Sequence, residues 1–255
     1  MDFLNLLWPL NFISMKRSLV AKDIKYGSDT KQKLDIYAPK NSSELRPVIL
    51  FWHGGSWKSG NKKHYAFVAD YLRSVGAVVC VVGHPLFPDQ AFPGFIDDAK
   101  QAIDWAKQNI HEYGGDPNKI FLMGHSSGAH IALIASLKNQ NKVTGCISIA
   151  VPNEISRHHY GQIFGQAFET QAEQPLHYIK SVKASGNFLL IHGRRDKIVS
   201  INDSVLINKE LHRAGHKTML VETRFGHFLV LLYISWPFGP LLGVGSFIKK
   251  FTGIS

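Results

Sequence analysis

Short and continuously apolar runs recur along the chain, and longer segments with helical spacing separate them. The runs lie at residues 48–51, 78–82, 120–123, 146–149 and 188–191. Strands of a parallel sheet that is covered on both faces have continuously apolar sequences, because neither face is exposed to water. The pattern therefore predicts a mostly parallel central sheet that lies inside the molecule.

Residues 95–110 show the spacing of an amphipathic helix. Apolar side chains fall near one face at Phe95, Ala99, Ile103 and Ala106, and the charged residues of the segment point elsewhere. Strands that alternate with such helices form right-handed βαβ units. The fold class that we expect is therefore α/β, with helices flanking both faces of the sheet.

Two segments depart from this rhythm. Residues 24–26 and 34–37 alternate apolar and polar positions, which indicates an antiparallel start to the sheet. Residues 152–187 contain three glycines, a proline at position 175 and several aromatic residues, but no strand pattern. We interpret them as a small helical cap insertion over the sheet, and insertions of this kind often cover a substrate pocket.

Two apolar stretches raise the question of membrane contact. A secretory signal begins with positive charge, whereas in residues 3–13 the apolar part precedes Lys16 and Arg17. This order favours a packed segment. Residues 228–248 carry no charge and are nominally long enough to span a bilayer, but prolines and glycines interrupt them. We expect a core-facing helix, a turn and a short final helix, with membrane-surface contact as the alternative.

Composition narrows the class of protein. The 255 residues are 45% apolar and 19% charged, which is typical of a folded chain, and this length suits one domain, residues 1–255. The formal charge of +10 comes from lysines and arginines that are dispersed in short pairs. The sequence shows no zinc-ligand spacing or helix-turn-helix pattern, so we expect no nucleic-acid partner. Cys80 and Cys146 lie in apolar runs and are expected to be free buried thiols. These features favour a cytoplasmic location.

The run Gly124-His125-Ser126-Ser127-Gly128 carries the strongest chemical signal. It follows the strand expected at residues 120–123 and precedes a helix expected at residues 129–137. A G-x-S-x-G run between a strand and a helix forms a nucleophile elbow, a tight turn that exposes the serine hydroxyl. We therefore predict that Ser126 is a nucleophile.

A serine hydroxyl needs a base to take its proton and an acid to orient that base. In this type of fold the acid and the histidine follow the serine in that order. Asp196 stands just past the strand at residues 188–192, and His227 follows the strand expected at residues 218–223. Asp203 is the weaker acid candidate, because it is expected to cap or enter the next helix.

The oxyanion that forms after attack needs backbone N–H donors that are already in place. One donor is expected from Ser127, and others from the loop His53-Gly54-Gly55-Ser56-Trp57 after the strand at residues 47–52. His53 itself is expected to bond to the neighbouring backbone. The candidates for the walls of the substrate pocket are Trp57, His125, Phe87, Phe164 and Phe228.

Residues 53–57 and 124–128 together resemble the esterase/lipase branch of the α/β-hydrolases, the group of carboxylesterases, feruloyl-esterase-like enzymes and kynurenine formamidase. Residues 34–39, 113–117 and the pairs Phe92-Pro93 and Asp98-Ala99 are similar to that branch too. The similarity extends from about residue 20 to the end.

The resemblance implies an α/β-hydrolase fold and hydrolysis of carboxylic esters through an acyl-serine, without cofactor or metal. Carried over by motif, the triad is Ser126, Asp196 and His227, and the oxyanion donors are Gly55, Ser56 and Ser127, with Gly54 as a further candidate. Two departures leave the substrate open: Ser56 stands where lipase-like members often have a third glycine, and residues 83–86 lack the tyrosine-arginine pair of many relatives.

The expected substrates are small-molecule esters with short to medium acyl chains, because the insertion is too short for a large lid. Formamidase or thioesterase chemistry with the same triad is the first alternative. A membrane-associated binding protein that has lost catalysis is the second, and it is disfavoured because all three triad positions are filled.

Overall fold

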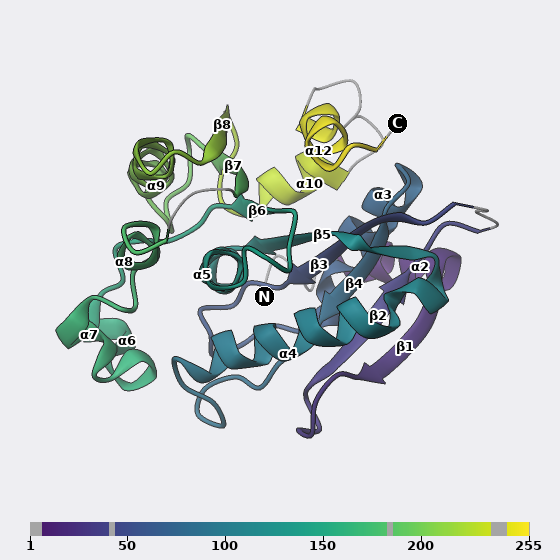
Figure 1. The fold of residues 1–255 in the computed structure, drawn as a ribbon, viewed down its shortest axis with the longest axis horizontal. Helices are drawn as coiled ribbons and strands as arrows, with labels where there is room; N and C mark the ends of the chain where they lie inside the picture. Colours follow the sequence, from purple (N-terminus) through teal and green to yellow (C-terminus); the bar gives the residue numbers. More distant parts are fainter. Residues whose placement is uncertain (1–6, 41–43, 183–185, 236–243, 255) are drawn as a thin grey trace.

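A twisted eight-stranded sheet runs through the molecule (Figure 1). The computed structural model describes residues 7–40, 44–182, 186–235 and 244–254. The strand order is β1-β2-β4-β3-β5-β6-β7-β8; the pairs from β4 to β8 are parallel, and β2 is antiparallel to both neighbours. The strands are β1 (Leu19–Lys25), β2 (Lys33–Tyr37), β3 (Arg46–Trp52), β4 (Val78–Val82), β5 (Gly115–His125), β6 (Gly145–Ile149), β7 (Asn187–Gly193) and β8 (Lys217–Thr223). The predicted α/β class and antiparallel start are confirmed.

The central strands are continuously apolar because successive side chains enter two different cores. In β3, Leu50 and Trp52 join the core on one face, and Ile49 and Phe51 join the core on the other. All four side chains are at most 1% exposed. Successive side chains of a strand point to opposite faces of the sheet. Because both faces are buried here, no position in the centre of the strand favours a polar residue.

Helices cover both faces, as the sequence pattern predicts. The first core is closed by α4 (Gly94–Asn109), α5 (Ser127–Lys138) and α9 (Ile201–Arg213). The second is closed by α3 (Ala66–Ser74), α10 (Leu229–Ser235) and α12 (Val244–Thr252). In α4 the buried residues recur every three or four positions, so one stripe of the helix faces the sheet. Two short 3₁₀ helices, η1 (Lys62–Tyr65) and η2 (Ile110–Tyr113), adjoin α3 and α4.

The segment between β6 and β7 is helical, in line with the interpretation of residues 152–187. It contains α6 (Arg157–Phe164), α7 (Ala167–Thr170) and α8 (Pro175–Ile179). Figure 1 shows α6 and α7 together at the periphery, while α8 lies between α5 and α9. Ile163 and Phe164 of α6 are buried in the first core, so the insertion is packed onto the sheet layer.

The N-terminal apolar stretch packs, as expected, where the structure describes it. Helix α2 (Trp8–Ser18) lies against α3, and the buried Asn11 accepts a hydrogen bond from the Phe67 N–H at 3.2 Å. Residues 3–6 and the turn expected at 237–243 lie outside the described residues, but α10 and α12 match the two helices expected around that turn. Within the described ranges, every helix is too short or too polar to cross a bilayer. The cytoplasmic location stays a prediction.

Candidate active site

Ser126 occupies a sharp turn between β5 and α5. Its φ and ψ angles are 55° and −123°, a strained conformation for a residue with a side chain, and its N–H donates to the Ile149 carbonyl at 2.9 Å. The turn is tight enough to require glycine on both sides. A Cβ on Gly124 would lie 2.2 Å from the Gly128 carbonyl oxygen, and a Cβ on Gly128 would lie 2.2 Å from that of Trp52. The local geometry is that of a nucleophile elbow.

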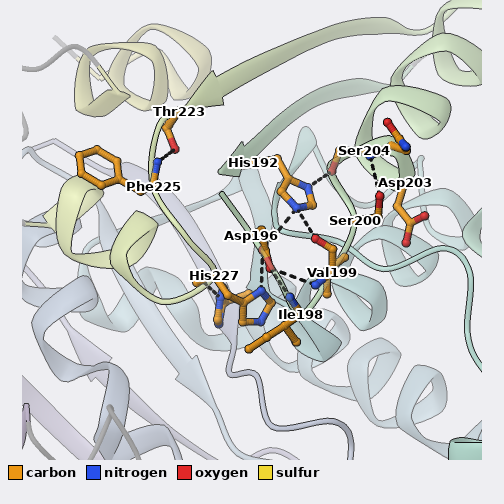
Figure 2. Close-up of polar contacts among 12 residues, drawn as sticks. His192, Asp196, Ile198, Val199, Ser200, Asp203, Ser204, Thr223, Phe225 and His227 are labelled. Carbon is orange, nitrogen blue, oxygen red and sulfur yellow. Dashed lines mark hydrogen bonds and ion pairs between the residues drawn. The ribbon is translucent and has the colours of Figure 1, made fainter. Parts of the chain in front are cut away.

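Asp196 and His227 meet at the carboxyl ends of β7 and β8 (Figure 2). The His227 Nδ1–H donates to Asp196 Oδ2 at 2.7 Å, and the His227 and Asp196 side chains are 4% and 0% exposed. Because Nδ1 carries the proton in this pair, Nε2 is left as the basic nitrogen. The loops are held together by the Arg195 N–H, which donates to the Phe225 carbonyl at 3.1 Å.

The Asp196 carboxylate is fixed from several sides (Figure 2). Its Oδ1 accepts the N–H groups of Ile198 and Val199 at 2.8 and 3.0 Å, and its Oδ2 lies 3.4 Å from His192 Nε2. Burial opposes ionisation, but the hydrogen bonds from His192, His227 and Val199 prevail and hold the pKa of Asp196 well below its usual range. Asp196 is therefore an anion at any working pH.

The weaker acid candidate, Asp203, and the buried histidine that precedes β8, His216, have other partners. Asp203 lies in the first turn of α9, and its Oδ2 accepts the N–H groups of Asn153 and Glu154 at 2.8 and 3.3 Å. It anchors the start of the insertion instead of holding His227. His216 is buried at the opposite end of β8, where its Nδ1 accepts the Gly186 N–H at 3.3 Å.

The loop after β3 lies against the elbow in a left-handed conformation. The φ angles of Gly55, Ser56 and Trp57 are 137°, 53° and 59°, and a Cβ on Gly54 would lie 3.2 Å from the Ser126 Cβ. In the part of the chain that the structure describes, no hydrogen bond uses the N–H of Gly55, Ser56 or Ser127. These three amides are therefore available to a developing oxyanion.

The expected role of Gly54 as an oxyanion donor needs a correction, because its N–H already donates a hydrogen bond within the protein. It donates to the Tyr65 hydroxyl at 3.1 Å. That hydroxyl in turn donates to His125 Nδ1 at 3.2 Å, and His125 Nε2–H donates to the His227 carbonyl at 2.9 Å. This relay joins the loop at residues 53–57 to the loop that carries His227, through the residue that precedes Ser126.

His125 also needs a correction, because it does not line the pocket. Its side chain is fully buried, and burial together with the nearby His227 lowers its pKa to about 3. A neutral His125 suits the relay, since it donates through one nitrogen and accepts through the other. Tyr65 was not identified from the sequence, since it lies 60 residues from its partner His125 in an unremarkable segment.

Replacing Tyr65 with phenylalanine tests this relay. The Gly54 N–H would lose its acceptor and His125 its donor, so the oxyanion loop would be held less firmly. We expect kcat on a neutral ester to fall about tenfold with little change in KM, and the free energy of unfolding to fall by about 1–3 kcal/mol. Tyr71→Phe, which removes a hydroxyl from the same core, is the control. Equal kcat values for the two variants would contradict the relay.

A cavity of about 270 Å³ opens at the elbow. Ser126 and Ser127 of the elbow line it, together with Trp57, Tyr160 and Ile155. The remaining lining residues are Ser56, Pro152, Glu154, Ile198, Val199, Ser200 and Asp203. The insertion and the loop before α9 thus build the pocket together. The sequence indicated a contribution from the insertion, but not the one from the loop before α9.

Of the aromatic candidates, Trp57 alone lines this cavity. Phe164 is 2% exposed and lies behind Trp57, with ring centroids 4.9 Å apart. Phe228 packs on His227 with centroids 5.0 Å apart, and the Phe87 N–H donates to the Trp57 carbonyl at 2.9 Å. These three phenylalanines support the site from outside the cavity, which corrects their expected role. His53 bonds to the neighbouring backbone as expected, with Nδ1 2.9 Å from the Gly54 carbonyl oxygen.

Buried histidines surround the site and make stability depend on pH. Burial lowers the pKa of His53 and of His130 to about 4, and that of His125 to about 3. Below pH 6.5 the unfolded chain binds protons that these buried side chains do not, so the free energy of unfolding falls as pH drops from 6.5 toward 4. Asp98, whose pKa burial raises to about 6, and Asp203, whose pKa burial also raises, oppose this trend. The three histidines, together with His84, whose pKa burial also lowers, outnumber them.

We therefore expect the protein to lose on the order of 1–2 kcal/mol of stability per buried histidine between pH 6.5 and 5. Urea unfolding at pH 7.5, 6.5, 5.5 and 5.0 measures it. His130→Gln keeps a donor for the Glu173 carbonyl, which His130 Nε2 contacts at 2.6 Å. This variant should lose less stability between pH 6.5 and 5 than the wild type does, by the amount expected for one histidine. A stability that is constant over this range would contradict the expectation.

No group of three or more histidine, cysteine, aspartate or glutamate side chains in the described ranges is arranged to hold a metal ion. The ends of β5, β7 and β8 carry a strained serine and a histidine-aspartate pair, and the amides of Gly55, Ser56 and Ser127 have no acceptor among the described residues. The BD-FAE family model matches residues 34–163, just over half of the chain. The chain belongs to the BD-FAE family. The predicted resemblance to the esterase branch of the α/β-hydrolases is confirmed.

Other similarities agree with membership of the BD-FAE family. Over 123 residues the chain is 37% identical to isoprenylcysteine alpha-carbonyl methylesterase ICME of Arabidopsis thaliana, covering 48% of this chain and 29% of that protein. It is 33% identical over 110 residues to the kynurenine formamidase of Danio rerio, covering 43% and 36%. The chain thus spans about a third of the length of these relatives.

A solved structure confirms the α/β-hydrolase fold. The phosphonate-inhibited esterase B of Lactobacillus rhamnosis superposes with a TM-score of 0.79 at 18% identity, over 98% of this chain and 94% of that one. The similarity therefore extends beyond the family match at residues 34–163 to the segments that carry Asp196 and His227.

Proposed function

We propose that this protein is a serine carboxylesterase that cleaves small esters with short to medium acyl chains through an acyl-serine intermediate. The observation that carries the proposal is the buried Asp196–His227 pair beyond β7 and β8, combined with a strained serine at the end of β5. The family match and the esterases among the relatives support the same reaction class.

In the first step, His227 Nε2 takes the proton of the Ser126 hydroxyl while the oxygen attacks the ester carbonyl. Asp196 stabilises the imidazolium that forms and keeps Nδ1 protonated. The carbonyl oxygen becomes an oxyanion, and the N–H groups of Gly55, Ser56 and Ser127 donate hydrogen bonds to it. The imidazolium then protonates the leaving alkoxide, and the acyl group stays on Ser126.

In the second step, water enters and His227 Nε2 takes one of its protons. The resulting hydroxide attacks the acyl carbon, the bond to Ser126 breaks, and the imidazolium returns its proton to the serine oxygen. The cavity of about 270 Å³ leaves room for a small acyl or alcohol group. This volume supports the proposed preference for short to medium chains.

The proposal is tested by measuring kcat/KM for a panel of p-nitrophenyl esters from acetate to palmitate. We expect the highest values for acyl chains of roughly two to eight carbons. A fluorophosphonate probe should label the protein with one equivalent, and peptide mass spectrometry should place the label on Ser126. Labelling at another residue, or no turnover of any ester, would overturn the assignment.

A second candidate is hydrolysis of a formamide by the same residues. The similarity to the Danio rerio kynurenine formamidase favours including it. N-formylkynurenine and an acyl-thioester of matched chain length should therefore be assayed beside the esters. We expect the ester to give the highest kcat/KM, and a higher value for N-formylkynurenine would reassign the main substrate.

A further inference from the structure

The cavity at Ser126 differs in charge from the rest of the protein. The chain carries a formal charge of +10, with 29 lysines and arginines against 19 aspartates and glutamates. The described residues that line the cavity, however, include two acidic residues, Glu154 and Asp203. They include no lysine, arginine or histidine. The substrate cavity is thus locally acidic in a basic protein.

The two carboxylates are held in place by different means. Asp203 is 7% exposed, and its Oδ2 accepts two backbone N–H groups, whereas its Oδ1 accepts no hydrogen bond from any described residue. Glu154 is exposed at the start of the insertion, and its own N–H is one of those two donors. The carboxylates therefore belong to one connected segment of the wall, with one buried and one facing solvent.

The nearby described cations Arg157 and Lys58 already contact other groups, and for Lys58 these include the ring of Tyr160 in the cavity wall. Arg157 pairs with Glu169 at 2.6 Å, and Lys58 Nζ lies 3.5 Å from the His159 carbonyl oxygen and 5.7 Å from the Tyr160 ring centroid. Lys197 is exposed in the loop before α9 and does not line the cavity. A positively charged group inside the cavity would thus meet two carboxylates and the aromatic side chains of Trp57 and Tyr160.

We propose that this cavity selects esters that carry a cationic group, such as a quaternary or primary ammonium, over neutral esters of the same shape and over esters with a carboxylate. This inference rests on the proposed esterase function and names its substrate class. Carboxylates stabilise a cation by charge, and aromatic rings stabilise it through their π faces. An anionic substrate would be repelled, and the cavity wall offers it no counter-charge.

Butyrylcholine and its uncharged isostere 3,3-dimethylbutyl butyrate form the decisive pair, because they differ in charge and hardly in shape. The ratio of their kcat/KM values should fall about three- to tenfold in Glu154→Gln, as expected for an exposed carboxylate close to the substrate. In Glu154→Lys the ratio should fall further, because the lysine would place a positive charge where the cationic substrate binds. Added salt should lower the wild-type ratio in the same direction.

Glu169→Gln is the matched control, since it removes the same charge from the same insertion at a residue 62% exposed and outside the cavity. Its ratio should equal that of the wild type. Equal ratios in the wild type, Glu154→Gln and Glu154→Lys would overturn the inference while leaving ester hydrolysis intact.

Binding separates this inference from the proposed activity. In a Ser126→Ala background, calorimetry measures the Kd of butyrylcholine without turnover. We expect Glu154→Gln to raise that Kd about three- to tenfold. If no ester were hydrolysed but Glu154→Gln still raised the Kd, the proposed activity would be wrong and the cavity would remain a cation-binding site. If Glu154→Gln left the Kd unchanged, the proposed cation-binding site would be wrong.

Discussion

Ser126→Ala is expected to lower kcat on p-nitrophenyl butyrate by about 10⁴-fold or more, to the level left by the oxyanion donors and binding alone. The reason is the loss of the attacking oxygen, which no neighbouring group replaces. Ser127 is buried at the start of α5, and no described residue accepts a hydrogen bond from its N–H. Steady-state kinetics, with circular dichroism to confirm the fold, measures the effect.

Ser127→Ala is the control for this variant. It removes the adjacent hydroxyl and keeps the backbone N–H that the mechanism uses, so its kcat should stay within about tenfold of the wild type. Both variants keep a side chain at each position, so the backbone strain at residue 126, where φ is 55°, is the same in the two proteins. Near-wild-type activity in Ser126→Ala, or a large loss in Ser127→Ala, would move the nucleophile to another residue.

The parallel strands, the elbow at Ser126 and the Asp196–His227 pair could be predicted because they depend on local sequence and chain order. A buried strand must be apolar on both faces, and β4, Val78–Val82, coincides with the run in the sequence. The elbow is equally local, since the two glycines are required by backbone atoms that would lie 2.2 Å from an added Cβ. Chain order then limited the acid and the base to a few residues after each strand.

The walls of the pocket could not be predicted in the same way. An aromatic residue in an insertion serves equally well as core or as pocket lining, and Phe164 is core while Tyr160, on the same helix, lines the cavity. The supporting contacts of His125 and Asp196 were missed for a related reason. Tyr65 and His192 reach them only after distant loops fold together, and nothing in their own segments marks that contact.

These supporting contacts explain how the site stays assembled in spite of strain. The unfavourable φ of Ser126 and the left-handed run at residues 55–57 each cost free energy. The relay from Gly54 through Tyr65 and His125 to His227 ties both strained segments to the base. The strained geometry is therefore held by buried hydrogen bonds whose loss would leave polar groups unpaired.

Asp196→Asn is expected to lower kcat/KM on the order of 10⁴-fold with little loss of folding. The asparagine amide would donate to His227 Nδ1, where the carboxylate now accepts, and the imidazole proton would move to Nε2. A protonated Nε2 cannot take the proton of Ser126. The N–H groups of Ile198 and Val199 could still donate to the remaining amide oxygen, so the loop itself should persist.

Glu222→Gln is the matched control, because Glu222 is a neighbouring carboxylate on β8 that pairs with the exposed Arg194 at 2.6 Å. It should keep kcat/KM within about twofold of the wild type, as expected for a surface pair. The pH profile adds a second test: because the defect of the Asp196→Asn variant is one of tautomer and not of charge alone, raising the pH above neutrality should recover only part of the activity. A small effect of Asp196→Asn together with a large effect of Asp203→Asn would instead make Asp203 the acid, and the 2.7 Å contact between Asp196 and His227 would then be structural.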